Sequence, residues 1–193
     1  LELPWGVVLD KNGHKADNVT IATPVAKVGE AEYASLAAAI KAASAGSTIT
    51  FIADINENVT LDKNVTIDGA GKTYTGTMSA NNALTVTVQN VNFVNGGFAK
   101  NNSGTSGTYT IKDCTFDGQS KYAYPVLAKN IGTLKVENCT VKDYQYGFLY
   151  VKAQSTKVSV KNVSVENCAS YAVFFASGVA ATIENLTVRN SNN

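Results

Sequence analysis

Five successive β-type segments of the chain carry an Asn or Asp at the same place, at intervals of 23 to 25 residues. These five residues are Asn90, Asp113, Asn138, Asn162 and Asn185. Each of them interrupts a stretch of alternating apolar and polar residues, as in Leu134-Lys-Val-Glu-Asn-Cys-Thr-Val141. A repeat of this length in a β-rich chain is typical of a solenoid, in which each turn stacks on the one before.

The pattern around each Asn or Asp predicts a corner between two strands. Apolar residues stand at −4, −2, +1 and +3 relative to it, and polar residues at −3, −1 and +2. Side chains of a strand alternate between its two faces. The residues at −2 and +1 can therefore both face inward only if the chain bends at the Asn or Asp between them. Asn and Asp tolerate the left-handed backbone of a one-residue corner. On stacked turns their side chains could also hydrogen-bond as a ladder.

This register predicts which residues face inward and which face solvent. Three inward rows are expected, and each takes one residue from every turn: Val88, Ile111, Val136, Val160 and Ile183; Val91, Cys114, Cys139, Val163 and Leu186; Phe93, Phe116, Val141, Val165 and Val188. An outward row alternates in charge along the axis: Lys112, Glu137, Lys161 and Glu184. Opposite charges on neighbouring strands help to fix the order of the turns.

A second corner and a third strand complete each expected turn. Turn-forming residues recur two positions after the last inward residue: Asn95, Gly118, Asp143, Asn167 and Asn190. Further strands are expected at 124–128, 146–150 and 171–175. Two less regular turns precede these, with Ile49–Ile52 as a buried strand and Asn64–Ile67 matching the second half of the motif. Three short strands per turn describe a single-stranded parallel β-helix.

The N-terminal part does not share the repeat. Residues 1–28 are expected to form a β-hairpin that acts as a docking arm, and residues 29–193 the β-helix. An Ala-rich stretch at about 30–45 has apolar residues at helical spacing, and Gly46 follows it as a stop. We expect this helix to cap the N-terminal end, because an open solenoid edge pairs with other chains. The last turn carries no such cap in the sequence, so we expect further sequence or another subunit to cover it.

Composition excludes several function classes. Charged residues make up 16% of the 193 residues, the formal net charge is +1, and Arg189 is the only arginine. The sequence therefore predicts no nucleic-acid partner. It contains no apolar run long enough to span a membrane, no signal peptide and no initiating Met. A composition poor in charge and rich in Asn, Thr, Val and Gly favours an extracellular location, and we expect a processed product, a fragment or the ordered part of a longer chain.

The three cysteines show no metal-binding spacing. Cys114 and Cys139 share an inward row on adjacent turns, which favours two packed free thiols. A disulfide between them remains an alternative, because sequence cannot show its geometry.

The stretch from residue 30 to residue 193 resembles the pectate-lyase-like right-handed parallel β-helix superfamily. The resemblance is carried by Ala34–Ala53 and by Val65-Thr-Ile-Asp-Gly-Ala-Gly-Lys72, which are similar to the helical cap and first turns of such modules. It implies a right-handed helix of the type found in bacterial surface proteins and in phage virion appendages. It does not imply one function, because one fold hosts many.

Enzymes of this superfamily act on polysaccharides, so catalytic patterns are relevant. Pectate lyases hold calcium with clustered Asp residues beside an Arg or Lys base, and the related hydrolases use paired Asp, Gly-His-Gly and Arg-x-Lys. None of these patterns occurs here, and the single His14 lies in the predicted hairpin. Asp113, Asp117 and Asp143 are the remaining carboxylates for acid–base work. Asp113 and Asp143 fall at corners, and Lys142 is expected beside Asp117 in the same outward row, on the next turn. We therefore predict no catalytic residue, metal or cofactor.

A cluster of aromatic residues is the best candidate for binding. Six of the nine tyrosines lie within 50 residues: Tyr122, Tyr124, Tyr144, Tyr146, Tyr150 and Tyr171. Exposed rings pack against sugar faces or serve as hot spots for protein partners. The alternative is that these rings line the core or brace the turns.

The sequence therefore predicts a non-catalytic module on the surface of a bacterial cell or phage virion. It would act as a rigid scaffold and binding face for a glycan or a protein, as in an adhesin. Self-association or attachment through residues 1–28 and the last turn is also expected. The alternatives are a polysaccharide lyase or hydrolase and a purely structural capsid or tail decoration protein.

Overall fold

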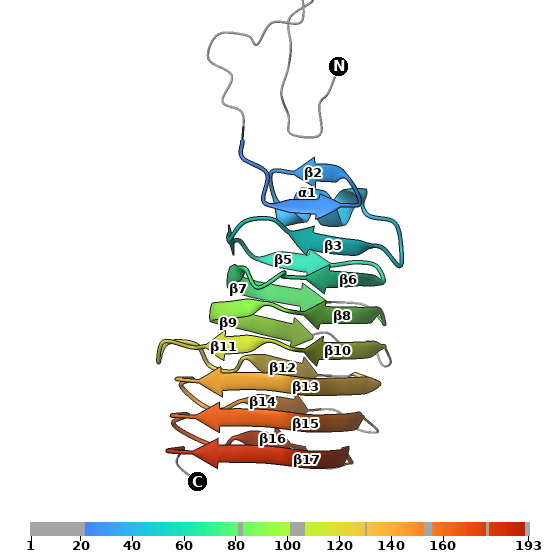
Figure 1. Ribbon diagram of the computed structural model, residues 1–193. Helices are drawn as coiled ribbons and strands as arrows, with labels where there is room; N and C mark the ends of the chain where they lie inside the picture. The colour runs from blue at the N-terminus through green and yellow to red at the C-terminus, as the bar shows by residue number, and fades with distance from the viewer. Residues whose placement is uncertain are drawn as a thin grey trace, which may run out of the picture.

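The computed structural model describes residues 22–80, 83–100, 107–129, 131–152, 156–176 and 178–191. The predicted arm lies largely outside these ranges, because residues 1–21, His14 among them, are not described. The described residues form an all-β solenoid whose turns stack along one axis from the blue to the red end (Figure 1).

Three columns of parallel strands make up the wall of the solenoid. The first column holds β3 (Thr48–Phe51), β6 (Val65–Asp68), β8 (Thr85–Gln89), β10 (Thr108–Lys112) and the first parts of β13 (Thr133–Lys142), β15 (Lys157–Glu166) and β17 (Ala180–Arg189). The second holds β4 (Ile55–Asn56), the first parts of β7 (Thr73–Ala80) and β9 (Asn92–Lys100), β11 (Thr115–Asp117) and the second parts of β13, β15 and β17. The third holds β5 (Val59–Leu61), the second parts of β7 and β9, β12 (Val126–Lys129), β14 (Leu149–Lys152) and β16 (Val173–Phe175).

The turns differ in length along the axis. The predicted spacing of 23 to 25 residues holds from β8 onward, since Thr85 pairs with Thr108 and Thr108 with Thr133. The earlier turns are shorter: Val65 is 21 residues from its partner Val86, and Thr48 is 18 from Thr66. The assignment of Asn64–Ile67 to the second half of the motif was wrong, because Val65–Asp68 pairs with β8 in the first column.

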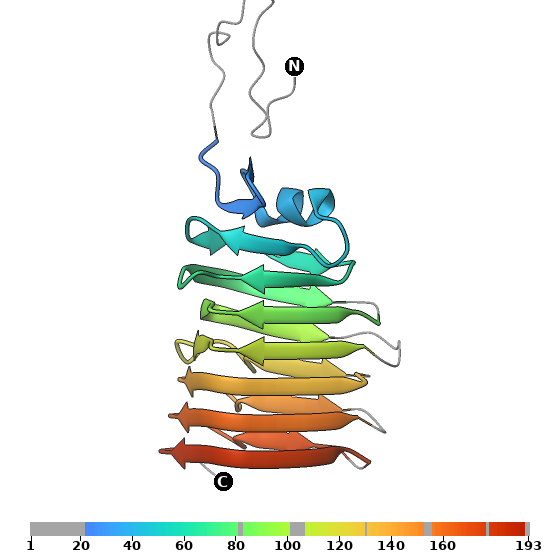
Figure 2. The same ribbon diagram turned by 45° about the vertical axis from the view of Figure 1, so that its right-hand side comes forward.

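The N-terminal end is built differently from the prediction. Strand β1 (Ala26–Val28) pairs antiparallel with β3 and with β2 (Ala31–Tyr33), and so covers the edge of the first column. Helix α1 covers Leu36–Ala42 rather than about 30–45. It begins after Ser35, whose hydroxyl accepts a hydrogen bond from the N–H of Ala38, and it ends at Ala43, where the backbone is extended. It contacts β1, β2 and β5 (Figure 2).

The inward rows form one continuous core. Val88, Ile111, Val136 and Val160 are fully buried in the first column, and an aromatic stack continues through the second. The ring centroids of Phe93 lie 5.6 Å from Tyr74 and 4.8 Å from Phe116, and Tyr74 lies 6.0 Å from Phe51. Only at β17 do inward positions become exposed, because no described strand lies beyond it.

All five corner residues adopt the left-handed backbone, with φ between 53° and 55°. Their side chains bond in one direction along the axis, each Nδ2 to the Oδ1 of the turn before. The distances are 3.0 Å from Asn138 to Asp113, 3.0 Å from Asn162 to Asn138 and 3.0 Å from Asn185 to Asn162. Asn90 donates to Asp68 Oδ1 at 3.1 Å. These side-chain bonds add to backbone hydrogen bonds at the same corners, such as the one from the N–H of Asp113 to the carbonyl oxygen of Glu137 at 3.0 Å.

Asp113 is the one member of the five-residue ladder whose side chain has no N–H to donate to the turn before it. Replacing Asp113 with asparagine is expected to raise the free energy of unfolding by about 0.5–1.5 kcal/mol, the usual value of one added hydrogen bond. Urea denaturation of the two proteins measures the difference. The opposite change, Asn138→Asp, places two carboxylates on adjacent turns and should lower stability. Equal stability of all three proteins would contradict a contribution from the ladder.

Candidate functional site

The outward row of the third column becomes aromatic toward the C-terminal end. In register order it reads Thr60, Ser79, Ala99, Leu127, Tyr150 and Phe174. Tyr124, Tyr146 and Tyr171 stand on the segments that lead into β12, β14 and β16. We call the surface formed by five of these residues the aromatic face: Tyr124, Tyr146, Tyr150, Tyr171 and Phe174.

Four rings of the aromatic face pack on one another, and three side chains of the face are exposed. Tyr150 and Phe174 are stacked with centroids 4.8 Å apart, and Tyr124 lies 5.3 Å from Tyr150 and 5.6 Å from Tyr146. Tyr171 is 58% exposed, Tyr146 46% and Phe174 38%. Rings held against one another lose little freedom when a ligand binds, so the arrangement favours binding.

Tyr124 is the centre of this cluster. Partial burial raises the pKa of its hydroxyl, and the neighbouring Tyr150, Tyr146 and Tyr171 add to the effect. Its ring leans over Gly147, where an ideal Cβ would lie 3.6 Å from Tyr124 Cε1. The Tyr124 hydroxyl is therefore neutral near neutral pH and can both donate and accept a hydrogen bond.

Two of the six predicted tyrosines do not belong to the aromatic face. Tyr144 is buried, and its hydroxyl donates to the Gly96 carbonyl oxygen at 2.8 Å. Burial raises its pKa. Tyr122 is half-buried, contacts Tyr144 edge-on at 6.3 Å and hydrogen-bonds Thr77 Oγ1. These two rings brace the turn, as the alternative interpretation predicts. Sequence reasoning also missed Phe174, although its alternation with the inward residue Val173 signals an outward position.

A cavity of about 420 Å³ adjoins the aromatic face on the third column. Tyr122, Tyr124 and Gln145 line one side of it, and Ala99 and Leu127 form part of its floor. Apolar walls beside aromatic rings, with an amide and hydroxyls at the rim, suit a ligand that has both apolar faces and hydroxyl groups.

Two lysines stand opposite each other at the end of the same strands. Lys129 of β12 pairs in register with Lys152 of β14. Like charges directly opposite on neighbouring strands are destabilising. The three third-column strands β12, β14 and β16 carry no acidic residue among their described positions. This part of the surface therefore has a positive potential beside the rings.

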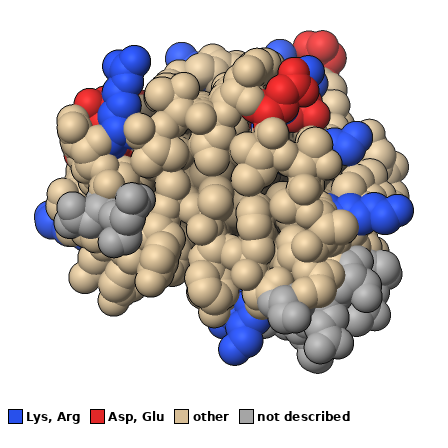
Figure 3. Space-filling model, turned by 90° about the horizontal axis from the view of Figure 1, so that it is seen from below, with Lys and Arg blue, Asp and Glu red and all other residues tan. Residues whose placement is uncertain are grey.

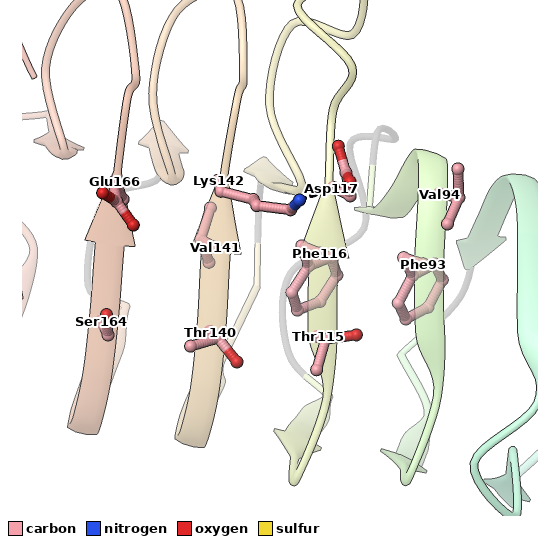
Figure 4. Close-up of a pocket in the computed structure, with 10 residues that line it drawn as sticks. All are labelled: Phe93, Val94, Thr115, Phe116, Asp117, Thr140, Val141, Lys142, Ser164 and Glu166. Atoms are coloured by element: carbon pink, nitrogen blue, oxygen red, sulfur yellow. Dashed lines mark ion pairs between the residues drawn. The ribbon is translucent and has the colours of Figure 1, made fainter.

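The carboxylates considered for acid–base chemistry are engaged elsewhere. Asp117 lies on the outward face of the second column, and Lys142 of the next turn reaches it, with Nζ 2.9 Å from Oδ2 (Figure 4). Burial acts to raise the pKa of Asp117, but the hydrogen bonds from Lys142 and from the N–H of Gln119 outweigh it and lower the pKa. Asp113 and Asp143 accept amide hydrogen bonds from Asn138 and Asn167. A general acid needs a raised pKa, and Asp117 has the opposite.

The three cysteines are buried free thiols. Cys114 and Cys139 occupy the predicted inward row, and each thiol points to backbone carbonyls, at 3.1 Å to Lys112 and 3.2 Å to Glu137. A hydrogen bond with the Cys139 thiol and burial raise the pKa of Cys114. Among the described residues, no group of three or more His, Cys, Asp or Glu is placed to hold a metal ion.

A scan against family models, a search of curated proteins and a search of solved structures found no match. Within the described part of the chain, no helix is long and apolar enough to cross a membrane.

Proposed function

We propose that the chain is a non-catalytic binding module displayed on the outside of a bacterial cell or a phage virion. In this proposal the solenoid is a right-handed, single-stranded β-helix of the pectate-lyase-like kind, with α1 as part of its N-terminal cap. The observation that carries the proposal is the aromatic face, where Tyr146, Tyr171 and Phe174 are exposed on one side of a stiff scaffold. The engagement of Asp117 by Lys142 supports the absence of catalysis.

A glycan is the ligand that this face fits best. Tyrosine rings present apolar faces to the C–H groups of a sugar, and their hydroxyls can bond its hydroxyls. The unfavourable Lys129–Lys152 pair favours a sugar with carboxylate or sulfate groups, because an anion between the two ammonium groups would relieve their repulsion. A low overall charge and buried thiols are compatible with an extracellular location.

Replacing Tyr124, Tyr146 and Tyr171 with alanine is expected to abolish glycan binding without unfolding the protein. Binding is measured on an array of neutral and acidic polysaccharides, and folding by circular dichroism. The matched control replaces three outward threonines of the second column, Thr115, Thr140 and Thr187, with alanine and should bind like the wild type. Unchanged binding by the tyrosine variant would reject the aromatic face.

A separate assay addresses catalysis. The wild type is incubated with pectin and with alginate in the presence of calcium, and unsaturated uronides are followed by ultraviolet absorbance. No release is expected. Release by the wild type would overturn the non-catalytic proposal and favour a polysaccharide lyase.

A further inference from the structure

The cavity beside the aromatic face is bounded by a tyrosine that spans a whole turn of the solenoid. The hydroxyl of Tyr122 hydrogen-bonds Thr77 Oγ1. Thr77 pairs in register with Gly97, and Gly97 lies against the carbonyl oxygen of Pro125 on the following turn. Tyr122 therefore reaches across the turn of Gly97, where the missing side chain leaves room for the cavity. All of these turns have described neighbours on both sides.

Backbone hydrogen bonds hold the walls and the floor of the cavity in place. The N–H of Gln145 donates to the carbonyl oxygen of Tyr122 at 2.9 Å, and the N–H of Phe98 donates to that of Pro125 at 2.8 Å. Phe98 and Ala99, which line the floor, are buried. A cavity with fixed walls loses little free energy to ordering when a ligand enters it.

The lining combines an apolar floor with polar groups at the rim. Gly97, Phe98, Ala99 and Leu127 form the floor, and the rim carries the Gln145 amide, the Tyr122 hydroxyl and the exposed Lys121. Among sugar substituents, an acetamido group matches both parts, because it has an apolar methyl group and an amide that donates and accepts hydrogen bonds. A carboxylate could pair with Lys121, but it would lose hydration against the floor without gaining an apolar contact.

The lysine pair follows the cavity along the same strands. Lys129 is the next outward residue after Leu127 on β12, and Lys152 is the next after Tyr150 on β14. Two residues of a strand cover about 7 Å. Neighbouring sugars of one chain can therefore reach the cavity and the lysine pair together.

The distribution of charge around the axis favours an anion on this side of the molecule. Seen from the C-terminal end, the visible Asp and Glu side chains lie toward one side, and the opposite side shows only Lys or Arg (Figure 3). The opposite side is that of β12, β14 and β16, which lie behind β13, β15 and β17 in Figure 1. A carboxylate near Lys129 and Lys152 would meet no described acidic residue of these three strands.

We propose that the ligand of the aromatic face is a polysaccharide in which a uronic acid alternates with an N-acetylated amino sugar. The acetamido group enters the cavity, and the carboxylate of the adjacent uronic acid lies between Lys129 and Lys152. Tyr124, which lines the cavity, and Tyr150, which pairs with Leu127, pack against the sugar rings. This inference rests on the proposed glycan-binding function and specifies the class of glycan.

Three hexasaccharides test the two halves of the proposal on the 193-residue chain. Hyaluronan carries both groups, carboxyl-reduced hyaluronan keeps only the acetamido groups, and polygalacturonate carries only carboxylates. Isothermal titration calorimetry should show that hyaluronan binds about tenfold more tightly than either of the others. The reduced form loses a charge-assisted bond, and polygalacturonate loses the burial of a methyl group and the amide bonds.

Protein variants test which residues make each contact. Ala99→Leu fills the floor of the cavity and should lower the affinity for hyaluronan about tenfold without changing that for polygalacturonate. Thr60→Leu is the matched control, because Thr60 lies in the same outward row two turns earlier and outside the cavity lining. Lys129→Gln/Lys152→Gln should bind hyaluronan and its carboxyl-reduced form equally. Circular dichroism shows whether each variant is folded.

The negative results separate this inference from the proposed function. Equal affinity of the wild type for hyaluronan and polygalacturonate would reject the acetamido cavity, whether or not Ala99→Leu folds. Equal affinity for hyaluronan and its reduced form would reject the lysine pair. Both results would leave glycan binding by the aromatic face intact. Binding of none of the three hexasaccharides by the folded wild type would overturn the proposed glycan binding, and this inference with it.

Discussion

Gly147→Ala is expected to lower the free energy of unfolding by about 3 kcal/mol or more, since a rigid clash exceeds the usual cost of overpacking. An ideal Cβ at position 147 lies 1.7 Å from the carbonyl oxygen of Tyr171 on the next turn. That oxygen is backbone, so the two turns must separate to relieve the contact. Alanine restricts the unfolded chain and recovers up to about 1 kcal/mol, which does not offset the clash.

The same replacement should weaken ligand binding, because it displaces Tyr171 from Tyr124 and Tyr146. Urea denaturation followed by circular dichroism measures stability, and glycan binding is measured on the fraction that remains folded. Gln145→Ala is the control for stability alone, because Gln145 is exposed on the same segment but also lines the cavity beside the aromatic face. It should change stability by less than about 0.5 kcal/mol. If Gly147→Ala were as stable as the wild type, the close approach of Gly147 to the carbonyl oxygen of Tyr171 would be contradicted.

Phe93→Ala is expected to cost about 3–5 kcal/mol, the usual range for removing a buried phenyl ring. Phe93 is fully buried and contacts rings on both neighbouring turns, edge-on with Tyr74 and face-to-face with Phe116. Its loss leaves a cavity that the stiff parallel strands cannot close. For a chain of this size, the melting temperature should fall by about 10 °C.

A surface phenylalanine provides the matched comparison. Phe174 is 38% exposed and stacks on Tyr150. Phe174→Ala should cost about 1 kcal/mol or less in stability but reduce binding at the aromatic face. Equal losses of stability from Phe93→Ala and Phe174→Ala would contradict the assignment of Phe93 to the core.

The regular turns could be predicted because one residue sets their geometry. An Asn or Asp at a fixed position imposes the corner, and the alternation around it then determines which neighbours face inward, as Val136 and Cys139 show. The alternating charge row from Lys112 to Glu184 followed from the same register. The columns and their pairing were therefore readable from Asn90 onward.

The irregular end could not be read in the same way. Val65 follows an Asn and precedes a Thr and an Ile, so the local sequence matches the second half of the motif. Its partner is nevertheless Val86, in the first half of the next turn, because this turn is shorter than the later ones. The antiparallel pairing of β1 with β3 has no local signal, because it joins residues 21 to 25 positions apart, with helix α1 between them. The helix was predicted too long because the high helix propensity of alanine does not show which residues are held in a strand instead. Ala31–Tyr33 lies within the predicted helix but forms strand β2.

The aromatic site was partly readable. Position along the strand predicts the outward direction of Tyr150, but Tyr144 comes just after a corner, where alternation gives no direction. Its inward orientation depends on a hydroxyl bond to Gly96, which is 48 residues away. Phe174 was missed because residues 171–175 were predicted only as a strand, with no assignment of its side chains to the inward or the outward face.

The stacking of parallel turns has a consequence for how the molecule comes apart. From β3 onward, the described strands of each turn pair only with those of the turn before and the turn after it, so stability is approximately a sum of nearest-neighbour terms. Among the described strands, β17 pairs on one side only, and it keeps exposed residues at inward positions such as Ile183. Opening should therefore begin at β17 and progress turn by turn, with backbone amides exchanging fastest there and slowest near Phe93. The molecule behaves as a one-dimensional zipper rather than as a single cooperative globule.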